Sequence, residues 1–259
     1  MIASISVIPA RSGSKSIREK NLSIVGGKPL IVRSLEAARI ITPGHKPVLS
    51  SDSDEYVEIA LSYFKEEIRL SDVKQNSARK ILDVGPFIFH KRSSNTSTDN
   101  ATIPEVLHEI SGDFLTNGLS LPSAWLLLQP TSPFRSNHDI QVWFEIAKEA
   151  RPSSSTISVL RVDDSHPARM YSMQDQQLNP LNLYPGFEAK RRQDLPPVFL
   201  RDGGFYLIGR NLVEAGKQFS ESPNGIVREF PWTINIDSLQ DLILAQAVAE
   251  LGFLNETNK

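Results

Sequence analysis

The chain has 259 residues, of which 40% are apolar and 22% charged, a composition typical of a globular protein with a sizeable core. Its 28 Lys and Arg side chains nearly balance 30 Asp and Glu side chains, leaving a net charge of −2 that disfavours binding to nucleic acid or a membrane surface. Cysteine is absent, which excludes disulfides, thiolate metal sites and a cysteine nucleophile. We expect a cytoplasmic protein, because the sequence shows no signal-peptide core and no membrane-spanning run.

Short apolar runs alternate with amphipathic helical patterns along the chain. The predicted elements are, in chain order, a strand at 3–10, a helix at 28–40, a strand at 46–54, a helix at 55–64, a strand at 81–92, a helix at 97–110, a strand at 124–130, a helix at 136–150, strands at 155–162 and 204–209, and a helix at 237–253. Thr98 and Asp99 are the expected capping residues of the third helix, and Ser238 with Asp241 has capping-box spacing at the start of the last.

This alternation predicts an α/β fold with a mostly parallel, Rossmann-like sheet that helices cover on both faces. We expect one domain over residues 1–259. The alternation stops at residues 163–200, a polar stretch with several prolines, which we expect to project from the sheet as a lid or a dimer arm. Residues 71–80 are expected to be a surface insertion.

Three polar stretches follow predicted strands, and in parallel sheets ligands bind beyond the carboxyl ends of the strands. They are RSGSK from Arg11, SSDSD from Ser50 and QPTSPFR from Gln129. We therefore expect a binding cleft at this edge of the sheet.

The first of these stretches carries Arg11, Lys15 and Lys20, with small residues at 12–14. Small residues let backbone N–H groups approach phosphate oxygens, and the cations add positive charge, so the pattern favours a triphosphate. The loop is not a Walker A motif, because Pro29 stands where a Ser or Thr is needed. A solvated basic turn is the simpler alternative.

Beyond these patterns, IPARSGSKSIREKN at residues 8–21 resembles the opening signature of the acylneuraminate cytidylyltransferases, also called CMP-sialic acid synthetases. Further stretches resemble that family in the same order and, together with the first, extend over nearly the whole chain. They are KRSSNTSTDNAT (91–102), LLLQPTSPFR (126–135), HPAR (166–169), RRQDLPPVFLRDGGFYLIG (191–209) and NIDSLQDL (235–242).

The resemblance implies a fold of the nucleotide-diphospho-sugar transferase type and a nucleotidyltransferase activity. Such enzymes combine CTP with a nine-carbon sugar acid with the help of Mg²⁺, release pyrophosphate and form a CMP-sugar. The resemblance also implies a homodimer. An eight-carbon acid, Kdo, is a less favoured substrate, because the first loop has the cation spacing of the sialic branch.

The family's site residues transfer to matching positions of this chain. Arg11, Lys15 and Lys20 would be catalytic, with Lys20 at the reacting phosphate. The positions expected to bind CTP are Arg11, Gly13, Ser14, Lys15, Lys20, Asn21, Arg92, Asp99 and Ala101. The positions expected to bind the sugar acid are Gln129, Arg169, Arg192 and Tyr206, the two arginines at its carboxylate.

Asp237 is expected to be catalytic by holding Mg²⁺, with a helix cap as its structural alternative. Asn235 stands where many relatives carry Asp, and it offers an oxygen without charge. Asp202 stands where the neuraminate-using members commonly have Asn, at a position that the resemblance places near the sugar.

Two other functions remain open from the sequence. Asp52 and Asp54 have the spacing of the metal signature of many glycosyltransferases, although a pair just before a helix is also typical of a helix cap. The second open function is that of a non-catalytic nucleotide-binding protein related to these enzymes. Asn235, in place of the family's Asp, favours this alternative.

Overall fold

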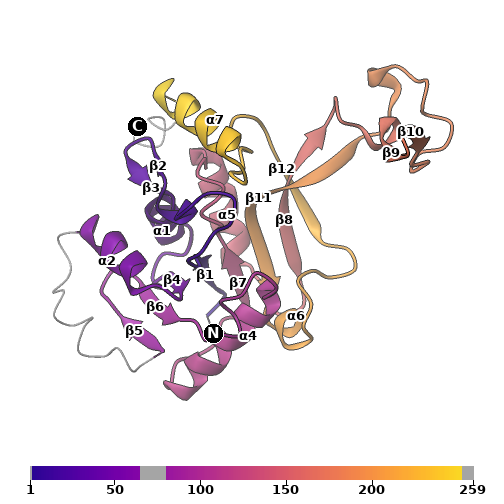
Figure 1. Ribbon diagram of the computed structural model, residues 1–259. Helices are drawn as coiled ribbons and strands as arrows, with labels where there is room; N and C mark the ends of the chain where they lie inside the picture. Colours follow the sequence, from indigo (N-terminus) through magenta and orange to yellow (C-terminus); the bar gives the residue numbers. More distant parts are fainter. Residues whose placement is uncertain (1, 65–79, 253–259) are drawn as a thin grey trace.

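The computed structural model describes residues 2–64 and 80–252, which form a central sheet with helices on both faces (Figure 1). The strands of this sheet are β1 (Ser4–Pro9), β4 (Val48–Ser51), β5 (Ile81–Asp83), β6 (Ile88–Lys91), β7 (Ala124–Leu127), β8 (Ser155–Val162), β11 (Val198–Gly209) and β12 (Asn224–Arg228). The helices are α1 (Leu30–Ile41), α2 (Asp54–Ser62), α4 (Ile103–Thr116), α5 (Asn137–Lys148), α6 (Arg210–Glu214) and α7 (Leu239–Glu250).

The eight strands lie in the order β12-β8-β11-β7-β1-β4-β6-β5. Strand β1 pairs in parallel with β4 and β7, and β4 pairs in parallel with β6, so the centre of the sheet is the predicted Rossmann-like arrangement. Strand β11 runs antiparallel to β7 and β8, and β5 runs antiparallel to β6. The fold class is therefore confirmed, with antiparallel strands added to a mostly parallel sheet.

The central strands are buried on both faces because their apolar side chains alternate in direction. Ile5 and Val7 of β1 pack in a cluster with side chains of α4, whereas Ile8 packs in a cluster with side chains of α1, α2 and α5. In β7, Trp125 and Leu126 divide in the same way between the two clusters. Continuous apolar strands of this kind are expected where helices cover both faces.

Helix α7 packs away from the sheet and covers the segment that follows the first loop. Its apolar side chains form a third cluster with Val25, Leu30 and Ile236. Gln246 of α7 also donates a hydrogen bond to the carbonyl of Ile24 (3.1 Å). The predicted capping box of this helix is confirmed, since Ser238 and Asp241 bond each other's backbone N–H groups. Helix α7 thus lies against residues 24–30.

Several predicted elements differ from the structure. Residues 81–92 form the hairpin β5–β6 rather than one strand, and Gly85 adopts a positive φ of 92° in its turn. The helix expected over 97–110 begins at Ile103, because the capping box is made by Thr102 and Glu105 instead of by the residues predicted to cap it, Thr98 and Asp99. The edge strand β12 was not predicted, since only two of its residues are apolar.

Within residues 163–200 lies a short hairpin of β9 (Tyr171–Gln174) and β10 (Gln177–Pro180), and Figure 1 shows it standing away from the rest of the protein. Every residue of both strands is exposed. The prediction that residues 163–200 are a projecting insertion within a single domain over residues 1–259 stays a prediction. The predicted surface insertion at 71–80 lies outside the described residues except for Lys80.

Among the residues that the structure describes, no helix has the length and apolar character needed to cross a membrane.

Asp202 lies in a β-bulge, where the register between β11 and β8 shifts between Arg201 and Tyr206. Its carboxylate is 2.8 Å from Nη1 of Arg228, whose Nε is 3.0 Å from Asp139, and all three charged side chains are buried. Gly204 makes this close approach possible, because a Cβ there would lie 2.0 Å from the Arg228 guanidinium. The Asp202 side chain is therefore turned into the protein and paired with Arg228, and the expected place of this position near the sugar stays a prediction.

We expect Asp202→Asn to lower the free energy of unfolding by about 3 kcal/mol, because it removes one partner of a buried arginine. Chemical denaturation of the variant and of the wild type measures this. Asp164→Asn, an exposed change, is the control and should leave stability unchanged. A fully stable Asp202→Asn protein with an altered choice of ligand would contradict this role.

Candidate active site

The first loop and the segment after β4 are joined at the carboxyl edge of the parallel strands. The backbone N–H and the hydroxyl of Ser12 donate to the two oxygens of Asp52, at 2.7 and 2.8 Å. Asp52 therefore anchors this loop, and it was not predicted to do so. The helix cap expected from the Asp52–Asp54 pair is made instead by Ser53, which accepts from the N–H of Tyr56.

Two cations of the first loop share one carboxylate. Arg11 makes a short ion pair with Asp99, and Nζ of Lys15 lies 2.5 Å from the other oxygen of the same side chain. The hydrogen bond from Lys15 and the charge of Arg11 lower the pKa of the Asp99 carboxyl below its usual value. The structure thus brings three predicted residues together, with Asp99 as the anion that balances the loop.

The third cation of the loop faces the start of the last helix. Nζ of Lys20 lies 3.1 Å from Oδ1 of Asp237 and 3.0 Å from the carbonyl of Ile236. The Lys20 side chain is only 12% exposed, whereas that of Asp237 is 69% exposed. The second oxygen of Asp237 accepts a hydrogen bond from the Asn235 amide (2.6 Å). Residues more than 200 positions apart therefore meet at one point, and both were predicted site residues.

The surroundings of Asp237 suit one Mg²⁺ ion better than two. Its carboxylate is exposed, and magnesium is commonly held by one or two carboxylates together with phosphate oxygens and water. The neighbouring carboxylate of Asp241 is occupied as a helix cap by the N–H groups of Asp237 and Ser238. Asn235 points its amide nitrogen, a donor, at Asp237 and its oxygen at Ser132. The donor set therefore fits a single ion shared with a ligand.

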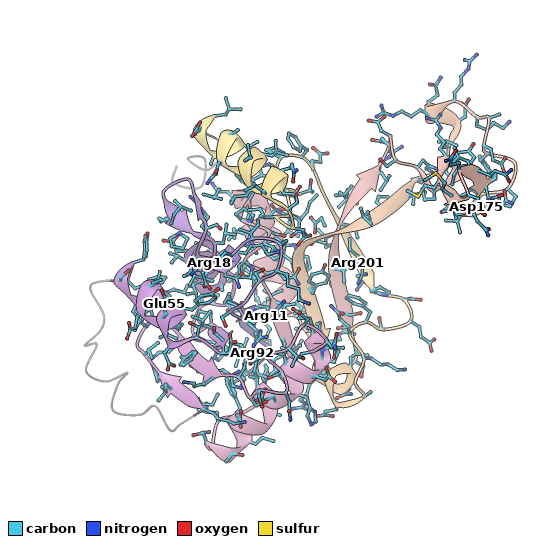
Figure 2. All side chains as sticks on the ribbon, in the orientation of Figure 1. Arg11, Arg18, Glu55, Arg92, Asp175 and Arg201 are labelled. Carbon is cyan, nitrogen blue, oxygen red and sulfur yellow. The ribbon has the colours of Figure 1, made fainter. Side chains whose placement is uncertain are left out.

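Arg92 lies buried at the end of β6, next to the first loop. Its Nε donates to the hydroxyl of Ser50 (3.0 Å) and its Nη1 to the carbonyl of Thr96 (3.3 Å). Burial lowers the pKa of Arg92 to about 10, so the guanidinium still carries its charge at neutral pH. The negative charge of Asp52 raises the pKa of Arg92, and the positive charge of Arg11 lowers it. Figure 2 shows Arg11 and Arg92 close to each other.

The remaining residues predicted to contact the nucleotide lie on the same loops. The Asn21 amide donates to the carbonyl of Arg11 (3.0 Å) and so shapes the loop from within. Gly13 has a positive φ of 70° and is exposed, a conformation that favours glycine. Ser14 is half-buried, and Ala101 is half-buried in the turn before α4. The predicted role of these four residues in binding CTP stays a prediction.

The predicted sugar-acid residues are more dispersed. The Gln129 carbonyl, at the end of β7, accepts a hydrogen bond from Arg135. Arg192 forms ion pairs with Asp163 and Asp164 at the base of the projecting segment, and Arg169 donates to a backbone carbonyl (3.1 Å), both side chains exposed.

Tyr206 pairs with Leu127, the last residue of β7. It is 7% exposed and packs in the core beside Phe219 at a ring distance of 5.9 Å, and burial raises the pKa of its phenol. This burial is what we expect of an aromatic side chain on a central strand, and the predicted contact of Tyr206 with the sugar acid stays a prediction.

Arg135 was missed although it ends the QPTSPFR stretch. Its guanidinium is buried, donates to the hydroxyl of Ser34 and to the Gln129 carbonyl, and stacks 5.3 Å from the Phe205 ring. It holds the loop that follows β7 in place. In the sequence, the only indication of this role is that a charged residue ends a stretch of otherwise uncharged residues.

A cavity of about 790 Å³ lies at the opposite edge of the sheet, where β8 and β12 begin. Half of its lining residues are serines, and Lys217 and Glu221 are its charged members. It holds no convergence of cations comparable to the carboxyl edge. Charge and geometry, rather than cavity size, identify the candidate site.

Parts of this chain are similar to known proteins. The sequence profile of a family described as Cytidylyltransferase matches residues 5–84, which contain the first loop and the segment after β4. A Legionella pneumophila protein named CMP-N,N'-diacetyllegionaminic acid synthase is 26% identical over 250 residues, covering 96% of this chain and 97% of that protein. An N-acylneuraminate cytidylyltransferase of Streptococcus agalactiae is 28% identical over 246 residues, 92% of this chain and 51% of that one. The chain thus spans about half the length of the streptococcal relative.

The fold also matches a solved structure. CMP:2-keto-3-deoxy-manno-octonic acid synthetase, solved in complex with CTP, superposes with a TM-score of 0.61 at 15% identity, covering 96% of this chain and 99% of that one. At this identity the likeness shows the fold alone.

We expect Asp99→Asn to strengthen the binding of inorganic triphosphate by roughly two- to fivefold, because it removes the internal anion that occupies two loop cations. Isothermal titration at constant salt measures the affinity. Asp54→Asn, which releases only Lys91, is the matched control and should leave the affinity unchanged. Weaker binding after Asp99→Asn would contradict this and show that Asp99 orders the two cations for the ligand instead of competing with it.

Proposed function

We propose that this chain, which belongs to the cytidylyltransferase family, transfers CMP from CTP to a nonulosonic acid of the sialic, legionaminic or pseudaminic type and releases pyrophosphate. The observation that carries the proposal is that cations of one loop are held only by exposed or half-exposed carboxylates, Arg11 and Lys15 by Asp99 and Lys20 by Asp237. A CMP-sugar acid synthase and an N-acylneuraminate cytidylyltransferase among the relatives support the substrate class. A cytoplasmic location is part of the proposal.

The proposed reaction needs charge neutralisation more than a covalent catalyst. The anomeric hydroxyl oxygen of the sugar acid attacks the α-phosphorus of CTP, and a new P–O bond forms. The bond from that phosphorus to the bridging oxygen breaks, pyrophosphate leaves with the bonding electron pair, and the proton of the hydroxyl passes to solvent water. Negative charge builds up on the phosphate oxygens, and fixed cations in a loop of small residues stabilise it.

In this proposal CTP replaces internal anions rather than entering an uncompensated cluster of charge. The triphosphate takes the place of Asp99 beside Arg11 and Lys15. Lys20 leaves Asp237 for the reacting phosphate, and the freed carboxylate becomes available to a cation. Asp237 would then hold Mg²⁺, which supplies further positive charge to the phosphates when bound.

The sugar acid brings a second negative charge, and arginine is the side chain that best matches a carboxylate. Arg192 supports this assignment, because it is exposed, accessible and already paired with carboxylates of Asp163 and Asp164. Arg169 lies in the same segment. We assign both to the carboxylate of the sugar acid, with Gln129 at its hydroxyl groups.

We also propose that the protein is a homodimer in which the projecting hairpin is covered by a second copy. A two-stranded hairpin is marginally stable by itself in water. This one exposes Tyr171, Met173 and Leu178, and Met173 is 72% exposed. A partner surface would bury these apolar side chains and stabilise the hairpin.

The glycosyltransferase alternative is disfavoured by the contacts of its two carboxylates. Asp52 accepts both hydrogen bonds of Ser12, and Asp54 is paired with Lys91. Neither is arranged with the other as a metal-binding pair. A non-catalytic relative predicts nucleotide binding without pyrophosphate release, which the following experiment decides.

Incubation with CTP, Mg²⁺ and a panel of sugar acids should release pyrophosphate with at least one nine-carbon acid. We expect Lys20→Ala to lower kcat by about 100- to 1,000-fold, since one stabilising charge at the reacting phosphate is lost. Lys28→Ala, which removes a lysine paired with Glu36 away from the loop, is the control. CTP binding without any turnover on the full panel would favour the non-catalytic relative, and an active Lys20→Ala enzyme would remove Lys20 from its role.

Arg192→Ala should raise the KM for the sugar acid about tenfold or more and leave the KM for CTP unchanged, because it removes uniform binding of one substrate. Steady-state kinetics with each substrate varied in turn measures both constants. Arg161→Ala, which removes a neighbouring partner of Asp163, is the control. An effect confined to the KM for CTP would contradict the assignment of this arginine.

A further inference from the structure

A chain of hydrogen bonds runs through the protein interior behind Arg92. The Nε of Arg92 lies 3.0 Å from Oγ of Ser50, that oxygen lies 3.0 Å from Nδ1 of His90, and Nε2 of His90 lies 3.1 Å from Oδ2 of Asp113. Ser50 and His90 are completely buried and stand opposite each other in the parallel ladder of β4 and β6. The chain therefore connects α4, two central strands and the candidate site.

The direction of each hydrogen bond is determined by the two ends of this chain. A guanidinium only donates and a carboxylate only accepts, so Ser50 accepts from Arg92 and, with a neutral His90 ring, donates its own proton to Nδ1 of His90. Nε2 of His90 then carries the proton and donates it to Asp113. Burial lowers the pKa of His90 below its usual value, against the effect of the hydrogen bond to Asp113, which agrees with a neutral ring.

A second set of contacts holds the other side of the guanidinium. Nη1 of Arg92 donates to the carbonyl of Thr96, whose hydroxyl donates to Glu109 of α4. Glu109 also accepts from the N–H of Ser93 (2.8 Å) and from Lys80 (3.1 Å). Burial raises the pKa of Glu109, but the hydrogen bonds from Thr96, Ser93 and Lys80 outweigh it and lower the pKa to about 2. This carboxylate is therefore charged and fixes the loop around Arg92.

Arg92 is thus held at Nε and at Nη1, while its Nη2 makes no hydrogen bond to any residue in the described ranges. A guanidinium fixed on two nitrogens presents the third in one direction. Cytosine offers acceptors at its carbonyl oxygen and ring nitrogen, which a fixed donor recognises at little entropic cost.

We infer that Ser50 and His90 are positioning residues that fix Arg92 so that its free nitrogen binds the pyrimidine of the nucleotide. The inference rests on the proposed function, since it assumes that CTP is the ligand. It adds two buried residues, neither touching the ligand, that determine how well the base is bound. Asp113 fixes the ring of His90 from the other side.

Ser50→Ala removes the partner of Arg92 Nε with little change in volume. We expect its KM and its dissociation constant for CTP to rise about tenfold, with the KM for the sugar acid unchanged. The preference for CTP over UTP should fall as well, because uracil carries a donor where cytosine has an acceptor. Ser4→Ala is the matched control, since Ser4 is also a buried serine on a central strand and its hydroxyl bonds only the Ala147 carbonyl (2.8 Å).

His90→Asn is the second variant. It keeps a hydrogen-bond acceptor near Ser50 and loses the hydrogen bond to Asp113. Its KM for CTP should rise about threefold relative to the wild type, with the KM for the sugar acid unchanged, and an unchanged KM for CTP would contradict the inference. The third measurement needs no variant: nitrogen-15 NMR of the wild type should show His90 neutral with the proton on Nε2.

The outcomes separate the two proposals. A wild type that does not bind CTP overturns the proposed function and this inference together. A wild type that binds CTP, with unchanged affinity and base preference in Ser50→Ala or with an equal loss in Ser4→Ala, overturns the inference alone. If Ser50→Ala does not fold, the kinetics of His90→Asn and the NMR result decide, and a His90 proton on Nδ1 or a charged ring at pH 7.5 overturns it.

Discussion

The positive charges of the first loop need anions, and this requirement organises the carboxyl edge of the sheet. The parallel pairing of β1 with β4 brings the loop against Asp52, and the pairing of β4 with β6 brings Arg92 beside both. Because the strands are buried on both faces by α1, α4 and α5, their ends cannot separate to relieve the repulsion between cations. The protein instead supplies carboxylates from distant parts of the chain.

These carboxylates differ in how firmly they are held. Asp52 accepts two hydrogen bonds from Ser12 and is part of the loop structure. Asp99 and Asp237 are more exposed and make ion pairs, which cost little to break in water. A phosphate ligand therefore meets a loop whose shape is already built and whose charges are only loosely satisfied. Binding then requires an exchange of partners more than a change of fold.

The sheet could be predicted because alternating apolar strands and amphipathic helices are local patterns. The order of the strands within it was not predicted, since it depends on which crossovers the chain takes. Residues 81–92 read as one strand because the turn at Gly85 is short and flanked by apolar side chains. The true cap of α4, Thr102, was overlooked in favour of Asp99, whose role is set by Arg11, 88 positions away.

The candidate site residues were chosen from motifs, and their roles stay predictions. The structure adds that two of them from opposite ends of the chain, Lys20 and Asp237, lie in contact. Buried residues that act through others gave no signal, because Ser50 and His90 look like ordinary strand positions. Asp202 illustrates the opposite case, in which a residue in a recognisable motif serves Arg228 in the interior. A motif indicates a location, and packing decides which side chains face outward.

The contact between Lys20 and Asp237 has a consequence for how the protein is made. Synthesis proceeds from the amino terminus, so the first loop leaves the ribosome long before Asp237 and α7 exist. Until those last segments emerge and pack on Val25 and Leu30, Lys20 lacks its carboxylate partner and the segment after the loop lacks its cover. The candidate site is thus completed last, and a chain released early by premature termination carries the loop without the contact to Asp237.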